Sequence, residues 1–136
     1  PRALALGQGP DAGVGVELVE IDRSERMIDE RAAHVFERLL TPAERAYCEE
    51  MARPADHVAA RLAAKEAVYK ALQGTPEARG IGWRDIEVER QPDGRPEVAL
   101  TGRAADRARE LGVTRILVSL SHTHRTAIAM AVLVRD

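Results

Sequence analysis

Aromatic residues, lysine and cysteine are all scarce in this sequence of 136 residues. Aromatic residues make up only 3% of the chain, so aliphatic side chains must form its hydrophobic core. The one cysteine, Cys48, excludes an internal disulfide and fits a reducing compartment, so we expect a cytoplasmic protein. Buried structural thiols are more common than nucleophiles, and we predict that Cys48 is structural. Lysine occurs only twice, at Lys65 and Lys70, although lysine and arginine together number 20.

Two further absences exclude whole classes of partner. The net charge is −2 at pH 7, so no basic field indicates binding to nucleic acid. No apolar run approaches the ~20 residues that span a bilayer, and no signal peptide is visible. We therefore expect neither a nucleic-acid nor a membrane partner. The sequence begins at Pro1 without a methionine, which fits a trimmed chain or one excised from a larger protein.

The length and composition indicate one globular domain. Apolar residues make up 45% of the chain and charged residues 31%, which is ordinary for a soluble globular protein. A chain of this length can bury one sizeable core. Residues 1–12 are rich in glycine and proline and indicate a flexible lead-in or linker. We predict that residues 13–136 form the single domain.

The residue patterns predict strands and helices in a mixed order. We expect Ser24 to cap one helix, Thr41 and Glu44 to form a capping box at the start of another, and Gly74 to end a third. The expected strands are 13–21, 83–90, 96–100, 116–120 and 126–134, and the expected helices are 25–38, 42–51, 54–73 and 102–111. This order predicts an α+β domain in which a mainly antiparallel sheet packs against the long central helix, with the helices on one side.

The long central helix carries a carboxylate in an unusual position. On a helical wheel Glu66 falls in the middle of an apolar face, and Lys70 lies one turn further, near the edge of that face. A carboxylate there is costly unless it is paired or coordinates a ligand. Compact ammonium groups such as Lys65 and Lys70 suit phosphate groups. The alternative is an ordinary solvated pair at positions i and i+4, worth ~0.3–0.5 kcal/mol.

A second acid lies among small and apolar residues of the first expected strand. Period-two alternation places Glu17 on the same side as Gly15, which would leave open space for a ligand. The opposite side of this strand carries Val14, Val16 and Leu18. Glu17 and Glu66 are hard oxygen ligands of the kind that Mg²⁺ takes together with substrate phosphates and water.

These residues suggest a Mg²⁺-assisted transfer reaction on a diphosphate substrate. Lys65, Lys70 and His122 are candidate phosphate partners. The sequence has no Walker-type loop and no complete dinucleotide fingerprint, which excludes those two phosphate sites. His122 and His124 would share one side of a strand end, but a two-histidine metal site would need a third ligand.

The assembled pattern resembles the holo-(acyl-carrier-protein) synthases, the short class of 4′-phosphopantetheinyl transferases. Residues 13–23 are similar to the family's opening G-x-G-x-D-x-x-E-x-x-R, and residues 61–72 are similar to its R-F-A-x-K-E-A-x-x-K-A. Residues 118–123 match V-S-[IL]-[ST]-H-[TD], and residues 83–88 and 94–96 look like the hairpin between these blocks. The resemblance spans about residues 13–134 and implies the phosphopantetheinyl transferase fold.

The resemblance implies an enzyme that moves the 4′-phosphopantetheine arm of coenzyme A onto a serine of an apo acyl carrier protein and releases 3′,5′-ADP. It makes Glu17 and Glu66 the Mg²⁺ ligands and Lys70 a diphosphate contact, and these three the catalytic residues. The positions that match the coenzyme A site, including its 3′-phosphate, are Arg53, Lys65, Lys70, His122 and Thr123. The positions that match the surface for the acidic carrier helix are Arg23, Arg26 and Arg31. The family is typically a homotrimer with sites at subunit interfaces, so Arg53 and the long helix would come from different subunits.

One position departs from the family pattern. The family usually has aspartate where this chain has Glu17, and the extra methylene shifts the carboxylate by ~1.5 Å. Mg²⁺ requires near-ideal octahedral geometry, and the longer side chain changes the position of one ligand. We nevertheless expect an active enzyme, with Mn²⁺ as an alternative metal. Two rival interpretations stay open: a non-catalytic module of the same fold that binds a carrier protein, and a transferase domain excised from a fatty-acid or polyketide synthase. The general base is also open between water on the metal, Glu17 and Glu66.

Overall fold

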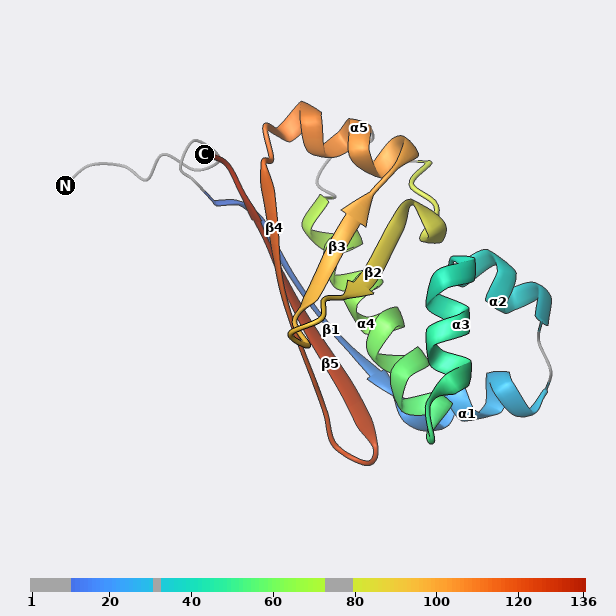
Figure 1. Cartoon of the computed structure of the whole chain (residues 1–136). Helices are drawn as coiled ribbons and strands as arrows, with labels where there is room; N and C mark the ends of the chain where they lie inside the picture. Colours follow the sequence, from blue (N-terminus) through green and yellow to red (C-terminus); the bar gives the residue numbers. More distant parts are fainter. Residues whose placement is uncertain (1–10, 31–32, 73–79) are drawn as a thin grey trace.

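The computed structural model describes residues 11–30, 33–72 and 80–136 (Figure 1). Its elements follow in the order β1 (Asp11–Glu20), α1 (Ile21–Asp29), α2 (Ala33–Leu39), α3 (Pro42–Glu50), α4 (Pro54–Leu72), the 3₁₀ helix η2 (Trp83–Asp85), β2 (Ile86–Arg90), β3 (Pro96–Leu100), α5 (Gly102–Leu111), β4 (Arg115–His122) and β5 (Thr126–Val134). The α+β class predicted from the sequence is confirmed. No helix among the described residues is long and apolar enough to cross a membrane.

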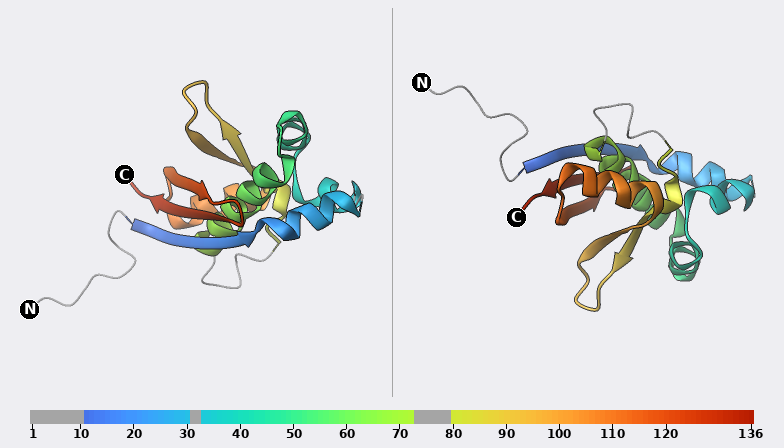
Figure 2. Two further views of the ribbon diagram at one scale, coloured as in Figure 1. Left: turned by 90° about the horizontal axis from the view of Figure 1, so that it is seen from below. Right: turned by 90° about the horizontal axis from the view of Figure 1, so that it is seen from above.

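The strands form two antiparallel sheets instead of one. The larger sheet has the order β1-β5-β4, and the smaller sheet is the β2–β3 hairpin. Figure 2 shows that this hairpin projects away from the larger sheet, and β3 contacts β4 of that sheet directly. Helix α4 contacts strands of both sheets as well as α1 and α3. The long helix is therefore the element around which the other layers pack, as the sequence predicted.

Burial of α4 on nearly all sides changes the predicted position of Glu66. The expected single apolar face with Glu66 at its centre is wrong, because the helix lies between two packed layers and its alanines are buried around most of its circumference. Glu66 instead lies on a partly exposed stripe that also carries Tyr69 and Lys70. The carboxylate of Glu66 is accordingly accessible from a cavity.

Strand β1 packs against α4 through glycine backbone. A Cβ added at Gly15 would lie 1.9 Å from the carbonyl oxygen of Ala67, and one added at Gly13 would lie 2.5 Å from that of Ala71. The prediction that Gly15 leaves open space for a ligand is wrong, since the backbone of α4 fills that space. The close approach instead brings Glu17, two residues further along β1, beside the partly exposed stripe of α4.

The first helical region differs from the prediction in its start and its continuity. Helix α1 begins at Ile21 directly after β1, and α2 is a separate helix. Ser24 is not an N-cap but lies buried inside α1, where its Oγ is 2.9 Å from the carbonyl oxygen of Ile21 and 2.8 Å from that of Ala55. Ser24 thereby fixes α1 against the start of α4.

Other boundaries agree more closely with the sequence. The capping box of Thr41 and Glu44 is present, with both of its hydrogen bonds. Strand β1 begins at Asp11, two residues before the expected start, and the first three residues of the expected strand 83–90 form η2. Residues 1–10 of the predicted lead-in, Arg31 and the expected cap Gly74 lie outside the described residues.

We predict that Gly15→Ala lowers the free energy of unfolding by about 1–3 kcal/mol, because the added methyl group overpacks the contact with Ala67. Urea denaturation measures this change. Gly82→Ala is the matched control, since its φ is −89° and its Cβ would meet no atom closer than 3.7 Å. An equal effect of both substitutions would contradict the proposed close packing of β1 on α4.

Candidate active site

Two glutamate side chains meet between β1 and α4. Lys70 Nζ lies 2.7 Å from Glu17 Oε2, and Arg23 Nη1 lies 3.9 Å from Glu66 Oε1. The other oxygen of Glu17, Oε1, accepts a hydrogen bond of 3.1 Å from the backbone N–H of Leu18. The structure thus brings Glu17 of β1 together with Glu66 and Lys70 of α4, and adds Arg23 from α1.

The two carboxyl groups have opposite electrostatic environments. The hydrogen bond from Lys70 holds the pKa of Glu17 below its usual value, and a hydrogen bond with Glu66 acts in the same direction. Burial raises the pKa of Glu66, and the neighbouring carboxylate of Glu17 raises it further. Glu17 is therefore the ionised member of the pair, and Glu66 is the member that more readily keeps a proton.

A divalent cation fits this pair of acids. Two neighbouring carboxyl groups repel each other when both are ionised, and a bound cation would relieve this repulsion. The described residues contain no cluster of three or more side chains of the metal-binding types, so Glu17 and Glu66 would be a two-carboxylate site. Such a site suits Mg²⁺, which takes one or two carboxylates together with substrate phosphates and water.

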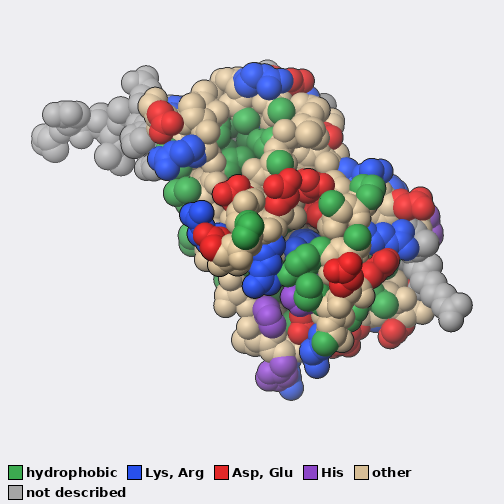
Figure 3. Space-filling model, in the orientation of Figure 1, with side chains coloured by type: hydrophobic (Ala, Val, Ile, Leu, Met, Phe, Trp, Pro, Cys, Tyr) green, Lys and Arg blue, Asp and Glu red, His purple; other side chains and the backbone are tan. Residues whose placement is uncertain are grey.

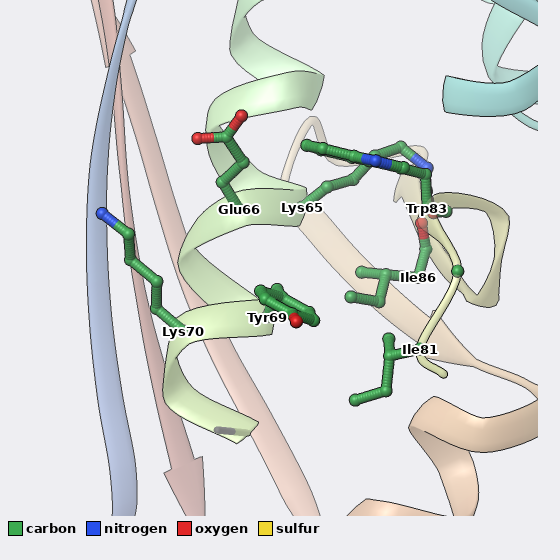
Figure 4. Close-up of a pocket in the computed structure, with 8 residues that line it drawn as sticks. Lys65, Glu66, Tyr69, Lys70, Ile81, Trp83 and Ile86 are labelled. Carbon is green, nitrogen blue, oxygen red and sulfur yellow. Dashed lines mark hydrogen bonds between the residues drawn. The ribbon is translucent and has the colours of Figure 1, made fainter. Parts of the chain in front are cut away.

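A cavity of about 410 Å³ opens beside Glu66 and has two chemically different halves. Figure 4 shows Glu66 and Lys70 on one side of it. The other side is mostly apolar and is formed by Tyr69, Ile81, Trp83 and Ile86. The cavity can therefore hold a ligand that joins an anionic group to a less polar arm. The sequence did not predict this apolar half, since Ile81 and Trp83 lie beside α4 only in the folded chain.

His122 lies at a second, separate cavity of about 220 Å³ between α3, α4, β2, β3 and β4. Its charged and histidine residues are Asp56, His57, Arg61, Glu89, Arg90 and His122. Figure 3 shows histidine side chains, with lysine or arginine beside them, at the lower end of the face of the molecule seen in that view. The arginines and histidines make this cavity suitable for an anionic group.

Arg61 is the most unusual residue of the second cavity. It is only 5% exposed, its guanidinium lies 4.1 Å from the centre of the Tyr47 ring, and its Nε has no hydrogen-bond partner among the described residues. Burial lowers the pKa of the adjacent His57, and the charge of Arg61 lowers it further. Arg61 and His57 were not predicted as site residues, although Arg61 opens the 61–72 motif.

The remaining predicted residues lie apart from the Glu66 cavity. Arg53 is exposed and pairs with Asp56, with 3.0 Å between Nε and Oδ2. Thr123 forms the β4–β5 turn, where its Oγ1 accepts from the backbone N–H groups of Arg125 and Thr126 at 3.1 Å each. Within one chain, neither Arg53, His122 nor Thr123 lines the cavity beside Glu66.

The predicted carrier-binding residues lie on the first helix. Arg23 and Arg26 are exposed on α1, and Arg23 is also close to Glu66. Arg31 lies outside the described residues. One basic side chain of this helix therefore adjoins the two-carboxylate site directly.

The model of the 4′-phosphopantetheinyl transferase superfamily matches residues 13–130. The chain belongs to this superfamily. The match covers both glutamates, Lys70 and His122, and it confirms the resemblance found in the sequence motifs. The chain is thus a transferase of the phosphopantetheinyl class.

Curated and solved members of the superfamily resemble the chain over most of its length. A holo-[acyl-carrier-protein] synthase of Moorella thermoacetica is 50% identical over 122 residues, which cover 86% of this chain and 89% of that protein. The structure of the synthase from Bacillus anthracis in complex with CoA (3′,5′-ADP) has a TM-score of 0.74 and 30% identity, covering 94% of this chain and 100% of that one. The Helicobacter pylori synthase in complex with coenzyme A has a TM-score of 0.73 and 27% identity, covering 88% and 98%.

The structure gives Lys65 of this transferase a different role from the predicted phosphate contact. Its side chain is 0% exposed, and its Nζ lies 2.7 Å from Glu44 Oε1. It also donates to the carbonyl oxygens of Trp83 at 3.0 Å and Ile86 at 2.5 Å. An ammonium group has three donors, and the protein itself uses all of them. Lys65 therefore joins α3, α4 and the start of β2, and no donor is left for a phosphate.

We predict that Lys65→Met lowers the free energy of unfolding by about 3–5 kcal/mol, because Glu44 would remain buried without its cationic partner. Lys70→Met is the matched control; Lys70 is half-exposed, and its loss should cost about 1 kcal/mol or less. Urea denaturation of both variants tests the assignment. A Lys65→Met variant as stable as the parent would return Lys65 to the list of ligand-binding candidates.

Proposed function

We propose that this transferase is a holo-[acyl-carrier-protein] synthase that acts in the cytoplasm. It transfers the 4′-phosphopantetheine arm of coenzyme A to a serine of an apo acyl carrier protein and releases 3′,5′-ADP. The observation that carries the proposal is the Glu17–Glu66 pair beside Lys70 at a cavity with one charged and one apolar side. The names of the curated relatives and the coenzyme A complexes of the solved relatives support it.

Glu17 and Glu66 would hold Mg²⁺, or Mn²⁺ in its place. When bound, the ion would neutralise oxygens of the substrate diphosphate and so favour charge development during transfer. Lys70 would add a fixed positive charge beside the same diphosphate. The apolar side of the cavity, formed by Tyr69, Ile81, Trp83 and Ile86, would hold the less polar pantetheine arm.

In the transfer step, the serine oxygen of the carrier attacks the β-phosphorus of coenzyme A in line. A new P–O bond to serine forms as the bond from the β-phosphorus to the bridging oxygen breaks, and 3′,5′-ADP leaves with the electron pair. Lys70 stabilises the charge on the departing phosphate. The serine proton passes to a general base, for which Glu17, Glu66 and water are the candidates. Arg23, Arg26 and Arg31 would face the acidic helix of the carrier and direct its serine toward Glu66.

A homotrimer would complete the site. Six large apolar residues on the face of the larger sheet opposite α4 are each at least 39% exposed: Val14, Val16, Leu18, Leu117, Ile128 and Met130. An exposed apolar face of this size favours burial against another subunit. Joining subunits over this face would let the Glu66 cavity of one chain meet the second cavity of its neighbour. Arg53, Arg61, His122 and Thr123 would then bind the nucleotide end of coenzyme A, including the 3′-phosphate.

We predict that Glu66→Gln lowers the rate of phosphopantetheine transfer by at least about 100-fold while the fold persists, because the amide keeps the shape of the side chain but cannot neutralise a cation. Intact mass spectrometry of an apo carrier protein, incubated with coenzyme A and Mg²⁺, measures the transfer. Glu49→Gln on the exposed side of α3 is the control and should retain the parental rate. Parental activity of Glu66→Gln would reject the metal assignment.

We predict that co-expressed Glu66→Gln and His122→Ala chains form mixed trimers with measurable transfer, although each variant alone is strongly impaired. Mixed trimers would contain interfaces at which the intact Glu66 of one chain meets the intact His122 of its neighbour. Different affinity tags allow the mixed trimers to be isolated, and the same mass assay follows their activity. Mixed trimers no more active than the separate variants, or a parent protein that is monomeric in solution, would exclude the shared site.

A further inference from the structure

Both oxygens of Glu17 already have partners within the protein. Oε1 accepts the hydrogen bond from the N–H of Leu18 at 3.1 Å, and Oε2 forms the ion pair with Lys70 at 2.7 Å. The side chain of Glu17 is 19% exposed, whereas the side chain of Lys70 is 50% exposed. Within the Glu17–Lys70 ion pair, the more exposed side chain of Lys70 is therefore the one that can change its position.

The proposed function gives Lys70 two positions that it cannot occupy together. In the structure its ammonium neutralises Glu17, but the transfer reaction requires it at the diphosphate of the substrate. A cation bound by Glu17 would compete with Lys70 for the same carboxylate oxygen. Arg23 is a weaker competitor at the other acid, since it is half-exposed and lies 3.9 Å from Glu66.

The length of the glutamate side chain supports this competition. An aspartate at position 17 would hold its carboxylate ~1.5 Å further back, about one C–C bond, which opens the 2.7 Å contact with Lys70. The local hydrogen bond to the N–H of Leu18 also depends on where this carboxylate lies. Glu17 is therefore suited to reach across to α4 and pair with Lys70.

We propose that Glu17 and Lys70 form an exchangeable ion pair that couples cation binding to diphosphate binding. A divalent cation that binds Glu17 displaces Lys70, and the displaced ammonium then binds the diphosphate. Each ligand consequently strengthens the binding of the other, and by linkage the two effects are equal. This inference rests on the proposed function and adds to it a regulation of the same site: the cation and coenzyme A bind weakly alone and tightly together.

The test is a double-mutant cycle on Mn²⁺ affinity, measured by electron paramagnetic resonance without coenzyme A. Lys70→Met should bind Mn²⁺ roughly tenfold more tightly than the parent, because the competing ammonium is gone. In the Glu17→Asp background the same Lys70→Met substitution should change Mn²⁺ affinity by about threefold or less, since the shorter acid is no longer paired with Lys70. Arg23→Met removes the same charge from the neighbouring acid and should change Mn²⁺ affinity by about twofold or less.

Fluorescence of Trp83 provides the measurement of coenzyme A binding, since it is the one tryptophan of the chain and lines the cavity beside Glu66. Mn²⁺ should raise the coenzyme A affinity of the parent on the order of tenfold or more, and this gain should fall in Lys70→Met. Equal effects of Lys70→Met with Glu17 and with aspartate at position 17 would overturn the exchangeable pair and leave the transferase proposal intact. Failure of the parent protein to bind both Mn²⁺ and coenzyme A would overturn the two proposals together.

Discussion

The direct contact between the backbone of β1 and the backbone of α4 is the constraint on which the site depends. Gly15 lies so close to Ala67 that no side chain fits between the strand and the helix. Glu17 therefore lies beside Glu66 and Lys70, although β1 and α4 are separated by three helices in the sequence. A wider spacing would separate the acid from both partners, so the chemistry of the site follows from a packing distance.

The two lysines of α4 have different roles: Lys65 stabilises the fold, and Lys70 is available to a substrate. Lys65 faces the β2 side, where Glu44 and two carbonyl oxygens surround its ammonium completely. Lys70 faces β1 and remains half-exposed, so its ammonium can change partners. The buried ammonium of Lys65 thus connects α3, α4 and β2, while the exposed ammonium of Lys70 is available to a substrate. The same residue type has two roles because the helix separates two different environments.

The local features of the fold were predictable from the sequence, and the long-range ones were not. The capping box at Thr41 and the extent of α4 follow from short-range hydrogen bonding and helical periodicity, and the motifs identified the family. The role of Lys65 depends on Glu44, an acid contributed by another helix. The space beside Gly15 is filled by α4, which a strand pattern cannot reveal. The second cavity around Arg61 likewise forms only when five elements meet.

Anomalous diffraction from crystals grown with coenzyme A and Mn²⁺ would locate the cation and Lys70 in one measurement. We expect a manganese peak between the carboxylates of Glu17 and Glu66, with Lys70 Nζ moved from Glu17 to the diphosphate. A manganese ion bound away from these two acids, or a Lys70 that still pairs with Glu17 beside bound coenzyme A, would contradict this expectation.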